Sequence, residues 1–347
     1  MTSQAPATPG TPSFSHCKVV LAGSIAKSIL ADVGEGLAKL PIKPKLVGFL
    51  ANEDPAAQMY ADWTGKTCRE NGFDFDLRVI TKEDIESAIV EANNDDSVHG
   101  IMVYYPIFSI TSRQDAYIKE LVDSSKDVEG LTHKYVFNLY QNNRFLDPPT
   151  NQLKSTLPCT PLAILKILEY LRVYNSILPY GNRLFGKGIT VINRSEVVGR
   201  PLAALLANDG AKVYSVDLDG IQLFTRGKGI RKKHHEVQDL PADFELKDAL
   251  AKSDVVISGV PSDKYKVDAS LIRGGAVCIN FSSEKNFDGP AVKEKASIYV
   301  PAIGKVTIAV LLRNLLRLVQ NQNALKAAAV TAATATPAAT TAPAGEA

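Results

Sequence analysis

Long apolar runs, paired cysteines and an excess of charge of either sign are all missing from this 347-residue chain. A helix that crosses a membrane needs ~20 apolar residues, and no run approaches that length, so no membrane span is expected. The four cysteines lie without C-x-x-C spacing, which indicates reduced thiols in a cytoplasmic protein and no zinc or other metal site. A net charge of +2 with both signs interspersed does not indicate a nucleic-acid or anionic-membrane partner.

Large apolar residues are also scarce at both ends of the chain. Residues 1 to about 16 are rich in Pro, Thr, Ser and Ala, and they lack the apolar stretch of a signal peptide and the arginines of a mitochondrial presequence. From residue 325 the chain is mainly Ala, Thr and Pro. Neither segment can bury enough surface to offset the entropy of ordering, so we expect disordered tails over 1–16 and 325–347.

Between these tails, apolar strands alternate with helical patterns. Helices are expected over 25–40, 55–71, 82–92, 115–122, 159–171 and 306–323, and strands over 45–50, 75–80, 100–105, 189–192, 212–216, 255–258 and 276–281. This alternation predicts an α/β fold with mainly parallel sheets covered on both faces. The length fits two α/β lobes, which we expect to change over near residues 155–180 and to bind ligand in the cleft between them.

The segment 188–217 has the layout of a dinucleotide-binding βαβ unit, so the second lobe is expected to be of the Rossmann type. An apolar strand leads into a polar turn at 193–195, Gly199 closes this turn, and Pro201 opens an apolar helix. The N-terminus of that helix offers free N–H groups and a positive dipole end to a pyrophosphate. The usual G-x-G-x-x-G is absent, so an ordinary α/β crossover is the alternative.

The second strand of this unit ends at Asp217. A carboxylate at this place can accept both ribose hydroxyls of adenosine, and it would repel the 2′-phosphate of NADP. The acid therefore indicates NAD as the cofactor. If the segment is an ordinary crossover, the acid lies in solvent.

Three further places carry side chains able to do chemistry. Tyr60 and Thr64 are four residues apart and share one helix face, whereas Lys66 points elsewhere. Tyr104 closes a strand at the end where ligands of parallel sheets gather, and Glu129 lies in a charged loop that ends in glycine. Each also has an ordinary interpretation as a core aromatic, a cap or a surface charge.

Taken together, six motifs occur in one order along the chain. They are Asp54-Pro55-Ala56 ahead of Tyr60, Gly100-Ile101-Met102-Val103 ahead of Pro106, Lys126-Asp127-Val128-Glu129-Gly130, Pro158-Cys159-Thr160-Pro161, Arg194-Ser195-Glu196-Val197-Val198-Gly199-Arg200-Pro201, and Thr307-Ile308-Ala309. This set resembles the methylenetetrahydrofolate dehydrogenase/cyclohydrolase family, and within it the fungal cytosolic NAD-dependent monofunctional branch. The resemblance covers residues 17 to about 325.

The resemblance implies a homodimer of two-domain chains, with folate bound next to a nicotinamide. Residues 17–160, completed by a helix over 306–324, would form the folate-binding catalytic domain, and residues 161–305 the NAD-binding domain. The implied reaction is the oxidation of 5,10-methylenetetrahydrofolate, with or without a polyglutamate tail, to 5,10-methenyltetrahydrofolate by hydride transfer to NAD. It would belong to the one-carbon metabolism that supports purine biosynthesis.

Individual residues acquire roles from the same resemblance. Tyr60 and Tyr104 would line the pterin, and Glu129 would accept hydrogen bonds from its amino-pyrimidine edge. The expected cofactor-binding residues all follow or end strands of the second domain: Asn193, Arg194, Ser195, Gly199, Val216, Asp217, Gly259, Val260, Phe281 and Ser282.

Departures from the family pattern are as informative as the matches. Bifunctional members have a catalytic lysine where this chain has Thr64, and a supporting glutamine where it has Tyr104. Threonine has no usable pKa near neutrality, and Lys66 is on the wrong helix face to replace the lysine. We therefore expect a dehydrogenase without cyclohydrolase activity. The alternatives are a dehydrogenase that keeps this activity and a non-catalytic NAD-binding protein.

Overall fold

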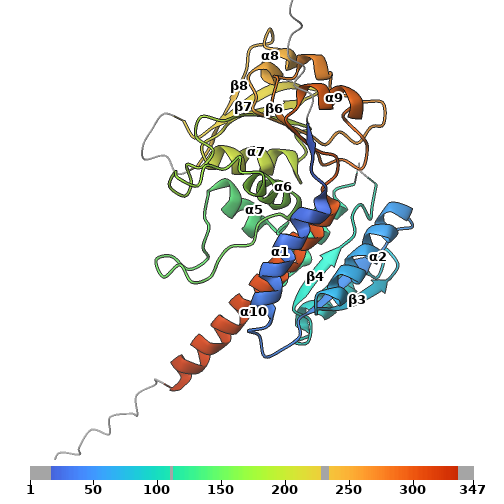
Figure 1. Ribbon diagram of the computed structural model, residues 1–347. Coiled ribbons are helices and arrows are strands. Elements are labelled where there is room, and N and C mark those ends of the chain that lie inside the picture. Colours follow the sequence, from blue (N-terminus) through green and yellow to red (C-terminus); the bar gives the residue numbers. More distant parts are fainter. Residues whose placement is uncertain (1–16, 110–111, 228–233, 335–347) are drawn as a thin grey trace, which may run out of the picture. The chain divides into compact units, whose positions relative to one another are not determined.

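The computed structural model describes residues 17–109, 112–227 and 234–334, and Figure 1 shows their helices and strands. They divide into two compact units. Unit 1 holds residues 17–28, Leu139–Asn142 and Thr160–Thr307, and unit 2 holds Ile29–Asn138, Asn143–Cys159 and residues 308–334. No helix within the described ranges is long and apolar enough to cross a membrane.

Unit 1 is built on an eight-stranded sheet with the order β1-β11-β10-β9-β5-β6-β7-β8. The strands are β1 (Lys18–Val19), β5 (Gly188–Ile192), β6 (Lys212–Asp217), β7 (Gly220–Thr225), β8 (Glu236–Asp239), β9 (Val255–Ser258), β10 (Val277–Asn280) and β11 (Ile298–Val300). From β1 through to β6 in this order, neighbouring strands pair in parallel, which confirms the prediction of a mainly parallel sheet, although β1 and β11 themselves were not predicted. The pairs β6–β7 and β7–β8 are antiparallel, and β7 and β8 were not predicted.

Helices cover the central strands of unit 1. The helices are α6 (Cys159–Tyr170), α7 (Gly199–Asn208), α8 (Leu246–Ala251), the 3-10 turn η1 (Ala269–Leu271) and α9 (Gly289–Lys295). One cluster packs side chains of β9 and β10, such as Val256 and Cys278, against Leu250 of α8 and Val292 of α9. Nearly all of α7 is buried, which is why its sequence is an almost unbroken apolar run.

Unit 2 contains a three-stranded parallel sheet in the order β3-β2-β4. The strands are β2 (Lys45–Leu50), β3 (Asp74–Val79) and β4 (Gly100–Val103), and the helices are α1 (Ala22–Leu37), α2 (Pro55–Glu70), α3 (Ile85–Asn94), α4 (Gln114–Leu121), α5 (His133–Tyr140) and α10 (Gly304–Thr334). Val47 and Ile101 of the sheet pack with Ile89 of α3 and Ile118 of α4.

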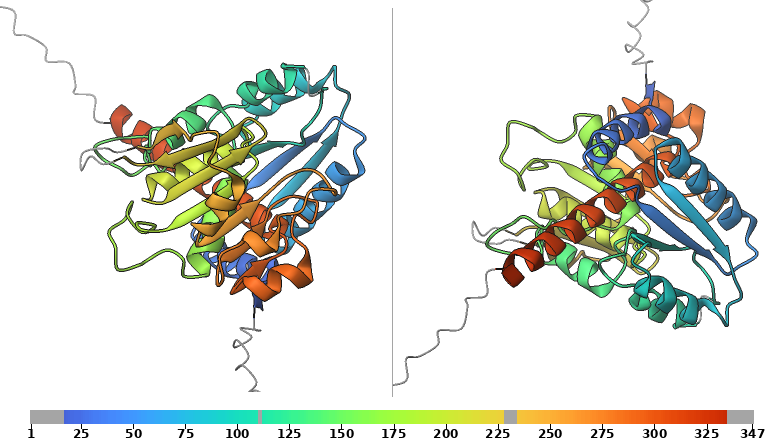
Figure 2. Two further views of the ribbon diagram at one scale, coloured as in Figure 1. Left: turned by 90° about the horizontal axis from the view of Figure 1, so that it is seen from above. Right: turned by 90° about the horizontal axis from the view of Figure 1, so that it is seen from below.

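Helices α1 and α10 of unit 2 run side by side (Figures 1 and 2). A β-carbon on Gly36 of α1 would lie 2.5 Å from Leu316 Cδ2 of α10, so the missing side chain lets the two helices approach closely. Both helices, together with α5 and α6, have residues in each of the two units.

Two predictions about the chain ends need comment. The predicted tail over 325–347 is wrong for residues 325–334, which continue α10. Alanine has the highest helix propensity, so this stretch stays helical although Leu325 and Val330 are exposed. The predicted tails over 1–16 and 335–347 otherwise lie outside the described residues. The predicted ligand cleft between the lobes stays a prediction.

Candidate active site

Loops that follow four parallel strands of unit 1 meet at one edge of its sheet. β5 lies between β6 and β9, so the strand order reverses beside β5. Such a reversal opens a crevice at the carboxyl edge, where α/β sheets bind ligands. The residues predicted to bind the cofactor lie at the carboxyl ends of β5, β6, β9 and β10 or in the turns that follow, except Gly199, which is the first residue of α7.

Asn193 and Gly199 shape the turn between β5 and α7. Asn193 has a φ of 95°, which confirms that it stands where the backbone favours glycine. Its Oδ1 accepts a hydrogen bond from Ser195 N at 2.8 Å, and its Nδ2 donates to Gly259 O at 2.6 Å. A β-carbon on Gly199 would lie 1.8 Å from Asn193 O, so this turn admits only glycine there.

Ser195 lies over the first turn of α7. Its Oγ accepts hydrogen bonds from Val198 N and Gly199 N, both at 3.3 Å. These N–H groups stand at the positive end of the helix dipole. A phosphate can take the same donors, because it is a stronger acceptor than a hydroxyl oxygen.

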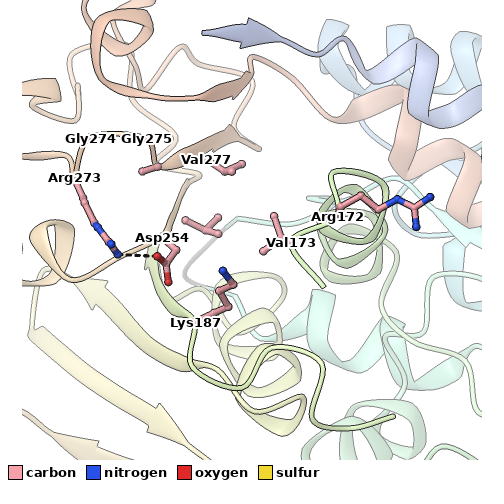
Figure 3. Close-up of a pocket in the computed structure, with 10 residues that line it drawn as sticks. Arg172, Val173, Lys187, Asp254, Arg273, Gly274, Gly275 and Val277 are labelled. Atoms are coloured by element: carbon pink, nitrogen blue, oxygen red, sulfur yellow. Dashed lines mark hydrogen bonds and ion pairs between the residues drawn. The ribbon is translucent and has the colours of Figure 1, made fainter. Parts of the chain in front are cut away.

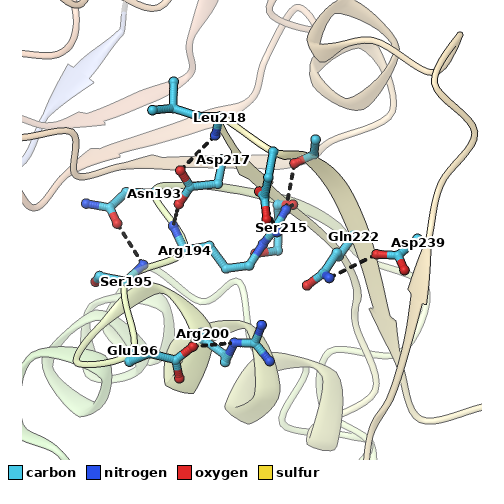
Figure 4. Close-up of polar contacts among 12 residues, drawn as sticks. Asn193, Arg194, Ser195, Glu196, Arg200, Ser215, Asp217, Leu218, Gln222 and Asp239 are labelled. Carbon is cyan, nitrogen blue, oxygen red and sulfur yellow. Dashed lines mark hydrogen bonds and ion pairs between the residues drawn. The ribbon is translucent and has the colours of Figure 1, made fainter.

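Asp217 ends β6 with an exposed carboxylate (Figure 4). Its Oδ2 accepts from Arg194 N at 2.6 Å and its Oδ1 from Leu218 N at 2.7 Å. Each carboxylate oxygen keeps capacity for one more hydrogen bond. The carboxylate is therefore fixed in place and still able to accept ribose hydroxyls. Val216, just before it, is buried, and its carbonyl oxygen accepts a hydrogen bond from Asn193 N at 3.0 Å.

Arg194 is expected from the family resemblance to contact the cofactor phosphates or ribose, but in this structure its side chain has other partners. Its side chain is only 5% exposed, and its guanidinium donates to Ser215 Oγ, Ser215 O, Asp219 Oδ1 and Gly220 O at 2.6–3.2 Å. These partners all belong to β6, to β7 or to the turn that joins them. A guanidinium has five N–H groups, so this network leaves one of them. The side chain thus holds the hairpin, and no spacing in the sequence indicated this.

Gly259 and Phe281 come from loops far apart in the sequence and lie in contact. A β-carbon on Gly259 would lie 2.0 Å from the Phe281 ring, so the glycine makes room for the aromatic side chain. Ser282 Oγ donates to Val260 O at 2.9 Å, which ties the same two loops together. The structure therefore brings these four predicted residues into one cluster.

A dinucleotide fits this edge of the sheet on structural grounds. The glycine-closed turn lets backbone approach a ligand closely, the start of α7 offers N–H donors, and Asp217 offers an anchored carboxylate one strand away. In the described ranges, no group of three or more His, Cys, Asp or Glu side chains is arranged to hold a metal ion.

A cavity of about 270 Å³ lies at the opposite edge of the same sheet (Figure 3). Lys187, Asp254 and Ala276 line it just before β5, β9 and β10, so it faces the amino ends of these strands. Arg273 pairs with Asp254 at 2.7 Å there. The cavity is therefore separate from the crevice at the carboxyl edge.

In unit 2, three predicted residues form one cluster. The rings of Tyr60 and Tyr104 meet edge to face, with centroids 6.1 Å apart. Thr64 is fully buried, and its Oγ1 donates to Tyr60 O at 2.8 Å. Burial raises the pKa values of both tyrosines, so each stays a neutral phenol near pH 7. The Tyr104 hydroxyl lies close to Thr64, but it forms no hydrogen bond of normal geometry with any described residue.

Lys66 lies away from this cluster, as predicted. Its side chain is 70% exposed and pairs with Glu70 at 3.9 Å, one turn further along α2. The buried face of α2 instead includes Ala61, Thr64 and Cys68. No lysine of α2 therefore takes the place of the missing catalytic lysine.

In the charged loop 126–130, some residues have structural roles and one faces the candidate site. Lys126 donates to three carbonyls at the end of α3, and buried Asp127 accepts from Gly130 N and Thr132 N, both at 2.8 Å. A β-carbon on Gly130 would lie 2.7 Å from the Leu157 carbonyl carbon, so the glycine permits close contact with the next motif. These side chains build the loop, and Glu129 is left for the site.

Glu129 is partly buried beside Tyr60, Tyr104 and Cys159. Its Oε2 accepts from Val103 N at 3.1 Å. Burial raises the pKa of its carboxyl to about 8, and the charge of Asp127 adds to this, while the Val103 hydrogen bond and Lys119 oppose it.

Lys119 was missed by the sequence analysis. Its ammonium lies 5.0 Å from the ring centroid of Tyr105 and favours the charged form of Glu129. It lies on the ordinary amphipathic helix α4, whose pattern gave no signal of a site.

The fold and the carboxyl-edge site define a two-unit α/β protein of the dinucleotide-binding class. Residues 20–129 match the family model "Tetrahydrofolate dehydrogenase/cyclohydrolase, catalytic domain", and residues 158–227 match "Tetrahydrofolate dehydrogenase/cyclohydrolase, NAD(P)-binding domain". The chain belongs to the tetrahydrofolate dehydrogenase/cyclohydrolase family.

Its similar proteins include fungal enzymes named methylenetetrahydrofolate dehydrogenase (NAD+). Identity to the protein of Schizosaccharomyces pombe is 61%, over 88% of this chain and 94% of that one. Identity to the protein of Saccharomyces cerevisiae is 62%, over 80% of this chain and 87% of that one. The solved structure of the NAD-dependent 5,10-methylenetetrahydrofolate dehydrogenase from Saccharomyces cerevisiae matches with a TM-score of 0.84 and 56% identity, over 89% of this chain and 99% of that one.

Proposed function

We propose that this protein is an NAD-dependent methylenetetrahydrofolate dehydrogenase, which oxidises 5,10-methylenetetrahydrofolate to 5,10-methenyltetrahydrofolate. The observation that carries the proposal is the exposed carboxylate of Asp217, fixed at the end of β6 by Arg194 N and Leu218 N. Relatives at 61% and 62% identity are named for the same reaction and the same cofactor.

NAD supplies the hydride acceptor when it is bound, and the nitrogen lone pairs of the substrate expel the hydride from its methylene carbon. No side chain has to remove a proton, because the product is a methenyl cation. The chain's own task is to bind and orient. Asp217 would accept the adenosine ribose hydroxyls, and Ser195, with the start of α7, would bind the pyrophosphate.

The remaining cofactor residues would act by shape. Asn193 and Gly199 keep the turn tight, which would let its backbone approach the cofactor closely. The cluster of Gly259, Val260, Phe281 and Ser282 would flank the adenine or the nicotinamide. Arg194 would position Asp217 rather than touch a phosphate itself.

We assign the substrate to the cluster in unit 2. Tyr60 and Tyr104 would line the pterin, since their neutral rings offer an apolar edge-to-face wall. Glu129 would accept hydrogen bonds from the amino-pyrimidine edge, whose N–H donors suit a carboxylate. These roles match the partly exposed position of Glu129 beside both tyrosines.

We also propose that cyclohydrolase activity is absent. The hydroxyl of Thr64 is bound to a backbone carbonyl of its own helix, and Lys66 is exposed on another face. Neither can exchange a proton with the methenyl bridge. The homodimer, the cytoplasmic location, a polyglutamate tail on the substrate and the link to purine biosynthesis stay predictions from the family resemblance.

Steady-state assays of methylenetetrahydrofolate oxidation with NAD and with NADP test the proposal. We expect NADH to form and NAD to be the better cofactor, and we expect Asp217→Ser to raise the NAD KM and narrow the preference. A preference of the unaltered protein for NADP would show that Asp217 has been misassigned. If saturating NAD produced no NADH, the non-catalytic alternative would stand instead.

A further inference from the structure

We propose that Asp219 and Arg194 form a second determinant of cofactor choice, in addition to Asp217. In this view the β6–β7 hairpin retains the buried guanidinium of Arg194, and this prevents the arginine from binding the 2′-phosphate of NADP. The inference rests on the proposed function, because it concerns how the same dehydrogenase rejects NADP.

The backbone and the side chain of Arg194 reach two different acids of one hairpin. Its backbone N donates to Asp217 Oδ2 at 2.6 Å, and its Nη1 donates to Asp219 Oδ1 at 2.9 Å. Asp217 and Gly220 face each other in the β6–β7 register, so both acids lie at the closed end of the hairpin. Figure 4 shows Arg194 extending from the turn after β5 toward Ser215.

Burial and charge make this arrangement selective. The Arg194 side chain is 5% exposed, whereas that of Asp219 is 75% exposed. The other guanidinium contacts are to Ser215 and to Gly220 O, which are neutral. Asp219 is therefore the only carboxylate within ion-pair distance of this guanidinium among the residues that the structure describes.

A 2′-phosphate at the ribose site would need a cation beside the end of β6. Arg194 is bonded to the very residues that define this end, but Asp219 already compensates its charge, and four of its five N–H groups have partners. The same hairpin thus presents one carboxylate that repels the phosphate and a second that occupies the cation able to attract it. Removing both carboxylates should expose a preformed phosphate ligand.

The test compares kcat/KM for NADP and NAD in the unaltered protein, Asp217→Ser, Asp219→Asn and the double variant. We expect Asp219→Asn alone to change little, because the acid at 217 still repels the phosphate. The double variant should gain NADP activity by about tenfold beyond the product of the single effects, as one charge-assisted hydrogen bond to phosphate supports. Inhibition by 2′,5′-ADP relative to 5′-AMP should rise in parallel, since these fragments report the phosphate directly.

Two controls separate this from a general loss of negative charge or of structure. Asp239→Asn removes a nearby carboxylate that accepts a hydrogen bond from Gln222 Nε2 at 2.9 Å and does not pair with Arg194. It should therefore leave the ratio of kcat/KM for NADP to kcat/KM for NAD unchanged. Arg194→Lys in the double variant should abolish the gain, because lysine lacks the planar fork. Thermal melting and the NAD KM of each variant check that the hairpin still folds.

The outcomes distinguish the inference from the proposed function. If the unaltered protein oxidises methylenetetrahydrofolate with NAD, and the two substitutions combine without synergy, the function stands and the second determinant is refuted. An equal gain in NADP activity when Asp239→Asn replaces Asp219→Asn in the double variant would also refute it. A protein inactive with either cofactor would overturn the proposed function itself, while the 2′,5′-ADP competition for nucleotide binding would still report on Arg194.

Discussion

The carbonyl oxygen of Asn193 lies 1.8 Å from the place where a β-carbon on Gly199 would stand. No real β-carbon tolerates that distance to backbone. The turn between β5 and α7 therefore requires a glycine at position 199. At its start it has Asn193, whose φ is 95°. This pair replaces the several glycines of the usual dinucleotide fingerprint.

Gly199→Ala should therefore displace the turn. We expect a loss of about 2–4 kcal/mol in the free energy of unfolding, the range for a steric conflict at a special backbone position, and a large rise in the NAD KM. Thermal melting and NAD kinetics measure the two effects. Gly34→Ala in α1 is the matched control, because nothing lies within 4 Å of its β-carbon and alanine favours a helix. If Gly199→Ala were as harmless as Gly34→Ala, the turn would have to be more open than described.

Substitutions of Asn193 separate backbone strain from hydrogen bonding. Asn193→Gly loses the hydrogen bonds to Ser195 N and Gly259 O but keeps the positive φ without strain. Asn193→Ala loses the same bonds and adds strain. We expect the free energy of unfolding to fall in the order Asn, Gly, Ala, with about 1 kcal/mol between the last two. Urea unfolding measures this order, and an alanine variant more stable than the glycine variant would contradict it.

The Rossmann half of the fold was predictable because its signals are local. An apolar strand, a glycine-closed turn and an acid at the end of the next strand are all read within 188–217. The β7 and β8 strands escaped prediction because they alternate weakly: β8 is exposed throughout, and β7 has one fully buried residue, Phe224. Residues 325–334 were misjudged because burial was treated as the source of helix stability, whereas alanine propensity sufficed.

The site was predictable in its residue types and less so in its contacts. The family pattern indicated Tyr60, Tyr104 and Glu129, which do lie together. It could not indicate that the Arg194 side chain turns toward β7, because its partners are two backbone carbonyls, a serine and an acid in a strand pair that was not foreseen. Backbone acceptors leave no trace in side-chain spacing. Lys119 was missed for a related reason, since only the folded chain brings α4 to the charged loop.

Glu129 should make stability depend on pH. The pKa of its carboxyl is raised from 4.5 to about 8 in the folded protein, mainly by burial. Its proton therefore stabilises the folded state fully below pH 4.5, and this contribution is lost as the pH rises toward 8, with a slope of up to about 1.4 kcal/mol per pH unit. In urea unfolding between pH 5 and 9, the free energy of unfolding of Glu129→Gln should rise relative to that of the unaltered protein as the pH increases. Glu91→Gln, at an exposed site of α3, should show no such trend.

The same proton should govern substrate binding. A charged Glu129 accepts hydrogen bonds from the pterin edge, whereas the protonated form offers a donor where donors already face it. With a pKa of about 8, the charged form is a minority at pH 7, so the KM for methylenetetrahydrofolate should fall as the pH rises through 8 and level off about one pH unit above the pKa. Glu129→Gln should raise the KM and flatten this profile. A profile that keeps its shape in Glu129→Gln would place the titrating group elsewhere.

Thr64 and Tyr104 occupy the positions of the catalytic lysine and its supporting glutamine in bifunctional members, so substitutions there should restore some cyclohydrolase activity. Both side chains are buried next to each other. A lysine at position 64 would therefore clash with the Tyr104 ring unless Tyr104 is replaced by a residue with a shorter side chain. We expect Thr64→Lys alone to leave decay of methenyltetrahydrofolate, followed by absorbance without NAD, near the buffer rate. Thr64→Lys with Tyr104→Gln should accelerate it by about tenfold or more, the low end of what a positioned acid or base contributes after an imperfect fit.

Lys66→Ala discriminates between this account and a residual cyclohydrolase. The exposed Lys66 ammonium pairs with Glu70, so its removal should change neither NADH formation nor methenyltetrahydrofolate decay. If the unaltered protein instead showed enzyme-dependent decay that Lys66→Ala abolished, α2 would have to present Lys66 to the substrate, against the helix geometry. The dehydrogenase reaction needs no lysine on α2. NADH formation by the variant with both Thr64→Lys and Tyr104→Gln therefore reports whether the substrate still binds beside Tyr60.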